Sequence, residues 1–187
     1  MKTESNVKYV FRLAATLLII TSVVAAALAG VNSITAPAIA KLTAEKTQLA
    51  IEAVLPGGGE ELSDLNAVGY EGADLVSRVY KGENGYAIEV TPGGFDNTIA
   101  MMVGVDFEGN ILGIDIIKHT ETAGLGAVAD AETPAGQNFR AQFVGMSGSV
   151  AVTKDGGTLD AITGATITSR AVCAGVNAAL ACAAALG

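Results

Sequence analysis

Residues 160–169 hold the most distinctive chemistry of this sequence, because they combine hydroxyl side chains with small neighbours. Gly164 and Ala165 leave little side chain beside the hydroxyl of Thr166, so a bulky enzyme or an anionic group can approach that oxygen. The Ala-rich residues 166–186 contain no Pro and predict a helix. The free amides and the positive dipole end at the start of such a helix favour a phosphate on Thr166.

A threonine hydroxyl is a weak nucleophile unless a base is held against it. The single histidine, His119, lies far from Thr166 in the sequence. We therefore expect a separate transferase to attach any group at Thr166. A simpler alternative is that the hydroxyls of this run only cap the start of the helix, as such residues do at strand-to-helix turns. The residues concerned are Thr163, Thr166, Thr168 and Ser169.

The run also matches a known pattern, Asp-x-x-Ser/Thr-Gly-Ala-Thr-x-x-Ser. Its defined positions are filled here by Asp160, Thr163, Gly164, Ala165, Thr166 and Ser169. The pattern resembles the site at which FMN is joined through its phosphate to a threonine in the FMN-binding subunits of the Rnf and Nqr respiratory complexes. This resemblance implies a covalent phosphoester between FMN and Thr166, with the other motif residues forming the attachment site.

A second segment, residues 119–126, resembles the His-x-Glu-Thr-Pro-Gly-Leu-Gly segment of the same family. Ala123 stands at the usual proline position, which removes a rigid turn element. We expect Leu125 to press on the isoalloxazine ring of the flavin, and Glu121 or Thr122 to hydrogen-bond its polar edge. Two glycines should let the backbone pass close to the flat ring, Gly124 and Gly126.

Other catalytic and binding classes find little support in the sequence. The spacing Gly124-x-Gly126-x-x-Ala129 satisfies a loose dinucleotide fingerprint, but Asp130 and Pro134 interrupt the helix that the fingerprint requires. His119 is interpreted as a hydrogen-bonded strand-end residue. We find no Ser/His/Asp or Cys/His constellation and no paired acids, and so expect no catalytic residue.

The amino-terminal segment predicts a membrane anchor. Residues 13–31 contain no charge and form a helix of about 28 Å, close to the hydrocarbon thickness of a bilayer. The preceding basic residues outnumber the acidic ones, which favours a cytoplasmic amino terminus and places the remaining domain across the membrane; they are Lys2, Lys8 and Arg12 against Glu4. A cleaved signal peptide is an alternative, with a cleavage site at residues 27–29, although the apolar run exceeds the usual length of a signal core.

Hydrophobic periodicity predicts an α+β domain. Pro37 opens a helical pattern over residues 38–55 that residues 56–59 end. The period then changes to two, and the predicted strands cover residues 75–80, 86–91, 99–105, 111–118, 149–153 and 159–162. Residues 106–110 carry turn chemistry and join two of these strands as a hairpin. Ile99, Met101, Val103 and Val105 should share one face of the first strand, and Leu112, Ile114 and Ile116 a common face of the second. The result is a mostly antiparallel sheet flanked by helices.

Charge and cysteine content exclude further classes. From residue 32 onward the chain carries 8 Lys or Arg and 18 Asp or Glu, a net charge of −10, which disfavours nucleic acid as a partner. Cys173 and Cys182 would lie about 13 Å apart along one helix and cannot bridge each other there. The sequence has no Cys/His cluster that predicts a metal centre.

The resemblance covers nearly the whole chain and is closest to the G subunit of the Rnf complexes. It implies an ion-pumping assembly that passes electrons between ferredoxin and NAD, in which this subunit is a redox relay with covalent FMN outside the cytoplasm. Expected partners are the other membrane and redox subunits, the flavin transferase and the membrane itself. Three alternatives stay open: the C subunit of the Na⁺-translocating NADH:quinone reductase, which tends to be longer, a cofactor-free membrane-anchored extracytoplasmic adaptor, and a free-standing FMN reductase.

The expected organisation has four parts. Residues 1–12 form a cytoplasmic basic leader and residues 13–31 a single membrane-spanning helix. Residues 32–59 form a membrane-proximal helix and linker, and residues 60–187 the extracytoplasmic FMN-binding domain.

Overall fold

A computed structural model describes the backbone of residues 2–62 and 70–187, and the side chains from residue 8 onward within those ranges. The chain divides into two compact units, Met1–Ala44 and Glu45–Gly187. The first helix, α1 (Lys2–Val54), begins in one unit and ends in the other. We describe each unit separately.

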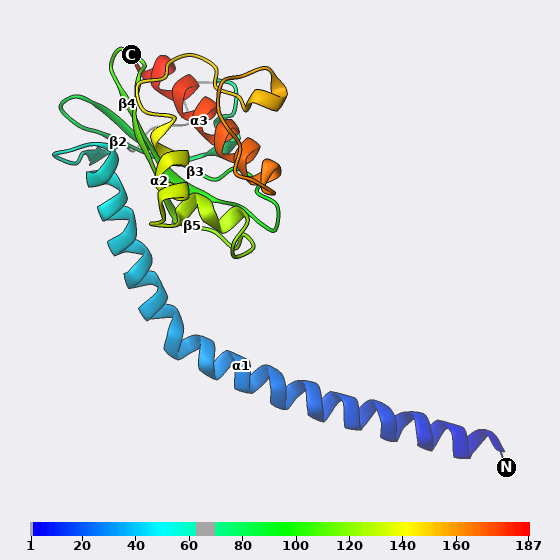
Figure 1. Cartoon of the computed structure of the whole chain (residues 1–187). Coiled ribbons are helices and arrows are strands. Elements are labelled where there is room, and N and C mark those ends of the chain that lie inside the picture. The colour runs from blue at the N-terminus through cyan, green and yellow to red at the C-terminus, as the bar shows by residue number, and fades with distance from the viewer. Residues whose placement is uncertain (1, 63–69) are drawn as a thin grey trace. The chain divides into compact units, whose positions relative to one another are not determined.

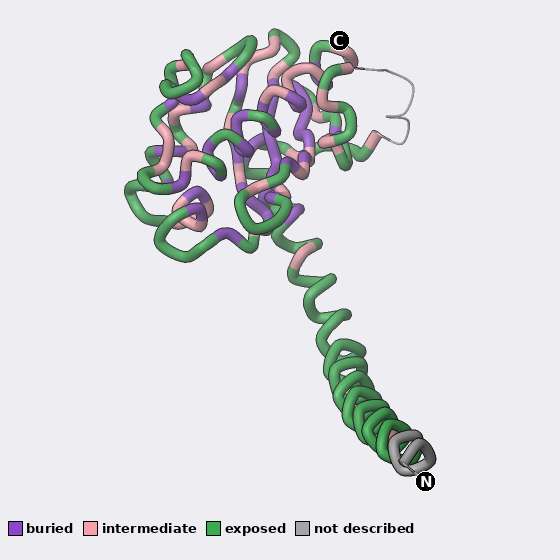
Figure 2. Tube along the Cα trace, turned by 90° about the vertical axis from the view of Figure 1, so that its right-hand side faces the viewer, coloured by how far each residue is buried: buried purple, intermediate pink, exposed green. Residues whose placement is uncertain are grey.

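The first unit is helical throughout its described residues, and its side chains from residue 8 to residue 44 are almost all exposed (Figure 2). The long apolar run within it has no buried residue, whereas most of the other long apolar helix, α3 (Thr166–Leu186), is buried. An apolar helix without a protein core around it needs an apolar solvent, so α1 has the length and composition of a membrane span. The helix α3 instead belongs to the core of the second unit.

Pro37 lies inside α1, so the prediction that a separate helix opens there is wrong. A proline in a helix removes one backbone hydrogen bond and crowds the preceding turn, at a cost of about 3 kcal/mol. Residues 38–54, which follow Pro37, are mostly good helix formers such as Ala, Leu, Lys and Glu, and these offset that cost and let the helix continue.

The second unit contains a five-stranded antiparallel sheet whose strands lie in sequence order (Figure 1). The strands are β1 (Glu60–Glu61), β2 (Val76–Lys81), β3 (Gly85–Val90), β4 (Ala100–Asp106) and β5 (Ile111–Lys118). Four of them lie where the period-two pattern predicts, which confirms those strands and the antiparallel α+β fold. Two short helical turns flank the region, η1 (Ala73–Leu75) before β2 and η2 (Gly126–Asp130) after β5.

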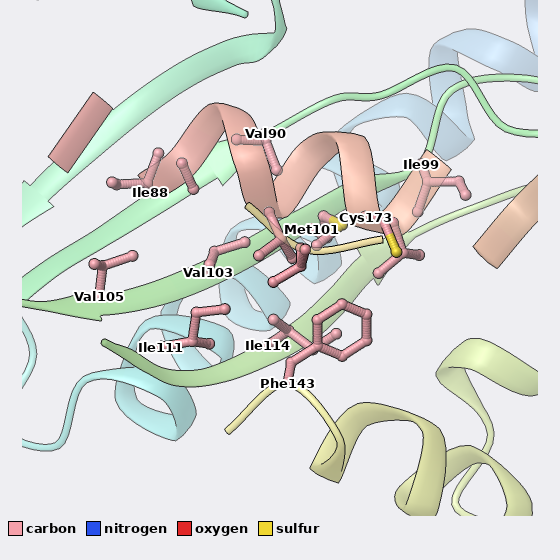
Figure 3. Close-up of a cluster of buried hydrophobic side chains, with 14 of the residues drawn as sticks. Ile88, Val90, Ile99, Met101, Val103, Val105, Ile111, Ile114, Phe143 and Cys173 are labelled. Atoms are coloured by element: carbon pink, nitrogen blue, oxygen red, sulfur yellow. The ribbon is translucent and has the colours of Figure 1, made fainter. Parts of the chain in front are cut away.

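The main core lies between one face of the sheet and α3 (Figure 3). The residues of β4 and just before it that were predicted to share a face are all buried in this core: Ile99, Met101, Val103 and Val105. Phe143, which follows α2 (Pro134–Ala141), is fully buried among them. Burying each such side chain contributes about 1.5–3 kcal/mol, and their convergence fixes α3 on the sheet.

The predicted face of β5 is partly wrong, because Leu112 is 37% exposed and Ile111 takes its place in the core. The register between β4 and β5 shifts between Gly104 and Val105. Such a bulge moves the side chains beyond it to the other face of the strand. Ile114 and Ile116 lie on the other side of the shift and are buried as predicted.

The opposite face of the sheet is covered by the last turns of α1. Residues on this helix form a second buried cluster with one side chain from each of four strands. The residues from the end of the helix are Ala50, Ile51 and Val54, with Leu55 directly after it, and the strand residues are Tyr80, Ala87, Met102 and Ile117. The sheet is therefore the middle layer of the second unit, between α3 and the end of α1.

Two strands predicted near the carboxy terminus, residues 149–153 and 159–162, are absent from the described chain. Their only pairing is a single parallel bridge between Val152 and Leu159. The chain turns back after Val152 through η3 (Thr153–Asp155), because the backbone amides of Asp155 and Gly157 both bond to the Val152 carbonyl. A ladder cannot extend through such a turn.

The helix α2 was not predicted. Thr133 caps its start by accepting a hydrogen bond from the backbone amide of Gly136, and Pro134 is the first helical residue. The Thr-Pro pair is a typical helix start, although Pro134 was interpreted only as an interruption.

Candidate functional site

A pocket of about 300 Å³ opens at the amino-terminal end of α3. This volume lies at the lower end of the range for small-molecule sites. Four separate stretches of chain line the pocket, and its residues are Phe95, Glu121, Thr122, Leu125, Gly126, Lys154, Gly164, Ala165, Thr166, Ile167 and Thr168. The structure therefore brings together the two segments that the sequence singled out, which lie about 40 residues apart in the chain.

Thr166 is the first residue of α3, and its half-buried side chain lines the pocket. The preceding residue, Ala165, has no side chain that can cap the helix, and no other side chain in the described part of the chain provides a cap hydrogen bond. The first amides of α3 are thus left without a side-chain acceptor, and an anion on Thr166 would meet the positive end of the helix. The interpretation of the hydroxyls as simple caps does not fit this geometry.

Gly164 shapes the turn before Thr166. Its φ of +77° lies in the left-handed region that favours glycine. A Cβ atom at this position would lie 2.9 Å from Cδ2 of Leu125. The absence of a side chain at Gly164 therefore lets the turn and the loop of Leu125 approach each other across the pocket.

The hydroxyls of Ser169 and Thr168 are buried and form hydrogen bonds with other groups of the protein. The Ser169 hydroxyl is fully buried, donates to the carbonyl of Ala165 at 3.0 Å and accepts from the backbone amide of Ile162 at 3.0 Å. Ser169 thereby closes the turn that carries the motif. The Thr168 hydroxyl donates to the carboxylate of Glu121 at 2.5 Å. Of the two motif hydroxyls that line the pocket, that of Thr168 is bonded to a buried carboxylate, whereas that of Thr166 contacts only the exposed Lys154 among the described side-chain hydrogen-bond partners.

Lys154 brings a positive charge to Thr166. Its ammonium nitrogen lies 3.4 Å from Oγ1 of Thr166. The adjacent Asp155 forms a two-pronged ion pair with Arg170 of α3, with nitrogen to oxygen distances of 2.7 and 2.6 Å. The Arg170 guanidinium, as hydrogen-bond donor, lowers the pKa of the Asp155 carboxyl below its ordinary value. This ion pair fastens η3 to the first turns of α3 and holds Lys154 beside Thr166.

Three exposed apolar side chains surround the pocket. Phe95 is 66% exposed, Leu125 44% and Ile167 50%, and they come from three separate segments. Exposed apolar groups that gather around one hollow mark a binding surface. Together with the cation at the start of α3, they suit a ligand with an apolar ring system at one end and a phosphate at the other.

Glu121 lines the pocket but its hydrogen-bonding capacity is largely taken by the protein. Glu121 is only 7% exposed. Oε1 accepts from the backbone amides of Phe95 at 2.8 Å and Asp96 at 3.3 Å, and Oε2 accepts from Thr168. Glu121 therefore joins three segments of the pocket wall, a role that the sequence did not predict for it.

The remaining predicted site residues lie outside this pocket. Asp160, Thr163 and Gly124 line a separate hollow beside α2. There the side-chain amide of Gln142 bonds to both backbone groups of Asp160, accepting from its N–H at 2.7 Å and donating to its carbonyl at 3.2 Å. Asp160 itself is exposed.

His119 lies at the end of β5 and is hydrogen-bonded, as expected of a strand-end residue. Its Nδ1 accepts from the backbone amide of Glu121 at 3.1 Å, and its Nε2 lies 3.6 Å from the Asp130 carboxylate. His119 does not line the pocket of Thr166. The pocket residues that sequence reasoning missed are Phe95, Lys154 and Ile167, and Thr168, which was considered only as a helix-capping hydroxyl. The glycine pair before Phe95 was an available signal of a binding loop.

Comparison with known proteins identifies the family. Residues 94–181 match the family of FMN-binding domains, a range that includes every residue lining the pocket. The G subunit of the Na⁺-translocating ferredoxin:NAD⁺ oxidoreductase complex of Acetobacterium woodii is 33% identical over 194 aligned positions, which cover 94% of this chain and 92% of the relative. The G subunit of the ion-translocating oxidoreductase complex of Yersinia pestis is 39% identical over 80% of this chain and 79% of its own. That of Methanosarcina acetivorans is 34% identical over 94% and 95%.

These comparisons confirm the predicted family and the prediction of FMN as the cofactor. The pocket fits that cofactor, since it offers apolar walls for a ring system and a cation and a helix start for a phosphate. The chain belongs to the family of G subunits of the ion-translocating oxidoreductase (Rnf) complexes, as an electron-transfer flavoprotein subunit with an FMN-binding domain and an apolar amino-terminal helix.

Proposed function

We propose that Thr166 carries FMN through a phosphoester and that the subunit relays electrons through this flavin. The observation that supports this most is the placement of Thr166, with an uncapped helix start behind it and an apolar pocket in front. When bound, FMN supplies one-electron and two-electron redox chemistry. The chain's own residues hold the phosphate end at Thr166 and Lys154, and shield the ring end with Phe95, Leu125 and Ile167.

The proposal includes a flavin transferase. Among the described residues the Thr166 hydroxyl has one side-chain hydrogen-bond partner, the ammonium group of Lys154, which is a cation and not a base. A threonine without a base needs outside activation. Asp160, presented by Gln142, and Thr163 form an exposed surface on the chain leading to Thr166, and we propose that the transferase contacts them there.

The wider role follows from the relatives. The Acetobacterium woodii protein is named as a subunit of a complex that couples ferredoxin and NAD⁺ to sodium translocation. We propose that this subunit, too, works beside other membrane and redox subunits between a ferredoxin and a nicotinamide. Covalent attachment suits a relay, because a cofactor that leaves its position breaks the electron path. The test is peptide mapping of the native protein: the tryptic fragment Asp155–Arg170 should be heavier by one FMN less one water.

We expect the Lys154→Met variant to accept FMN more slowly than the wild-type protein. Lys154 would pair with the incoming phosphate near the surface, and exposed ion pairs contribute about 0.2–1 kcal/mol, so a decrease of roughly 1.4- to 5-fold is expected. The measurement is the initial rate of flavin transfer by a co-purified transferase, followed by fluorescence. Lys118→Met, which removes an exposed lysine at the end of β5, is the control. Equal slowing in both variants would assign the effect to net charge alone.

We also propose a topology, in which residues 1–12 stay in the cytoplasm, residues 13–31 span the membrane, residues 32–59 link the span to the domain, and residues 60–187 lie outside. A cysteine introduced at exposed Glu108 should be labelled by an impermeant maleimide in intact spheroplasts. A cysteine at Ser5 should be labelled only after lysis. The natural cysteines should stay silent, because both are buried and burial raises the pKa of the Cys173 thiol to about 11. Labelling of both sites in intact cells, or of neither, would contradict this orientation.

A further inference from the structure

A buried carboxylate forms part of the wall of the pocket. Among the described residues that line it, Glu121 and Lys154 are the charged ones, and they differ in how far they are exposed to solvent. Lys154 reaches Thr166 from an exposed turn. Glu121 is 7% exposed, and both of its oxygens accept hydrogen bonds from the protein.

The hydrogen bonds of Glu121 join three parts of the pocket. Oε1 accepts from the backbone amides of the loop that carries Phe95. Oε2 accepts from Thr168, which lies in α3 two residues after Thr166. Glu121 itself belongs to the segment of Leu125. One side chain therefore sets the spacing between both apolar walls and the helix that starts at the attachment residue.

Two glycines make room for this carboxylate. A Cβ atom on Gly94 would overlap Oε1 of Glu121, and a Cβ atom on Gly126 would overlap Oε2 and the Thr168 hydroxyl. Neither glycine has a positive φ, so space rather than backbone conformation explains glycine at these positions. The sequence predicted that Gly126 lets the backbone approach a flat ligand. In the structure its missing side chain accommodates Glu121.

We infer that Glu121 is a positioning residue whose negative charge also lowers the reduction potential of the flavin. This inference rests on FMN occupying the pocket. A flavin gains negative charge as it takes up electrons, and a fixed negative charge in a poorly solvated wall opposes that gain. The three hydrogen bonds keep the charge in place by replacing the water that burial removes.

The Glu121→Gln variant separates the charge from the positioning role. Glutamine keeps an oxygen that accepts from Phe95 and Asp96, and its amide can donate to the Thr168 hydroxyl. We expect this variant to be loaded with FMN and to show a midpoint potential shifted to more positive values in an equilibrium titration against a reference dye. Glu121→Ala removes every bond, and we expect it to lose most of its flavin loading, which the glutamine variant restores.

The matched control is Glu89→Gln. Glu89 is a mostly buried carboxylate on β3 that pairs in register with Met102, on the face of the sheet that α1 covers. Removing its charge should leave the flavin potential unchanged. An unchanged potential in Glu121→Gln, or an equal shift in both variants, would overturn the inference.

Thr168→Val gives a second, independent measurement. It removes the hydroxyl that donates to Oε2 and leaves the charge of Glu121 in place. Without this hydrogen bond the carboxylate should repel the electrons on the reduced flavin more strongly, so the reduction potential of the flavin should become more negative at alkaline pH. A potential that does not change, or that becomes more positive, counts against the inference. Absence of covalent flavin from the wild-type protein is a different result, because it contradicts the proposed function itself and is seen by intact mass before any potential is measured.

Discussion

The Thr166→Ala variant is expected to carry no covalent flavin, while its fold stays intact. The other hydroxyls of the motif cannot replace Thr166, since Thr168 and Ser169 are buried and hydrogen-bonded and Thr163 lines a different hollow. Among the described residues the Thr166 side chain makes one long hydrogen bond, to Lys154, so its loss should change stability by less than about 0.5 kcal/mol. The measurement is intact mass together with flavin fluorescence in a denaturing gel, after coexpression with a flavin transferase.

Two control variants sharpen this prediction. Thr166→Ser keeps the hydroxyl and should retain covalent flavin, although at a lower yield if the transferase contacts the methyl group. Thr163→Ala keeps the Thr166 hydroxyl and should still carry covalent flavin, loaded more slowly because the proposed transferase contact at Thr163 is lost. Flavin that persists on Thr166→Ala would refute attachment at this residue. A native protein whose fragment Asp155–Arg170 is unmodified would refute covalent attachment at Thr166.

The sequence predicted those parts of the fold that depend on residues close to one another in the chain. The alternation in residues 99–105 places every second side chain against α3, and burial of that set gives an unambiguous strand. The motif around Thr166 was recognisable because its small residues, its hydroxyls and the helix that follows are neighbours in sequence. The same reasoning failed at Leu112, since a bulge between two strands depends on their pairing and leaves no mark on either strand alone.

Long-range contacts explain what the sequence could not predict about the site. Phe95 enters the pocket because its backbone amide bonds to a carboxylate 26 residues away, and Lys154 because the neighbouring Asp155 pairs with Arg170. Neither residue belongs to a recognisable motif. Glu121 was singled out, yet its partner Thr168 lies 47 residues further on, so its role as a connection between segments required the structure.

A large effect on stability is also expected on the face of the sheet against which the end of α1 packs. Gly104 of β4 and Gly113 of β5 are register partners beneath Val54. A Cβ atom on Gly104 would overlap the backbone carbonyl of Val54, whereas a Cβ atom on Gly113 would lie 3.8 Å from a Val54 methyl group, an ordinary contact. The two positions therefore differ in the space available and little else.

Gly104→Ala is expected to destabilise the protein by about 1–3 kcal/mol, the usual cost of forcing extra volume into a packed contact. Gly113→Ala should be neutral or slightly stabilising, because alanine reduces the entropy of the unfolded chain without a clash. The comparison is made on the full-length protein in detergent, by the midpoint of urea unfolding. The rate of backbone amide hydrogen exchange should rise at Ile51, Val54 and Leu55 in the Gly104 variant only. The reason is that the end of α1 then packs less tightly against Ala87 and Met102. Equal unfolding midpoints for the two variants would show that α1 does not rest on the sheet at Val54, since only a close approach there distinguishes the two glycines.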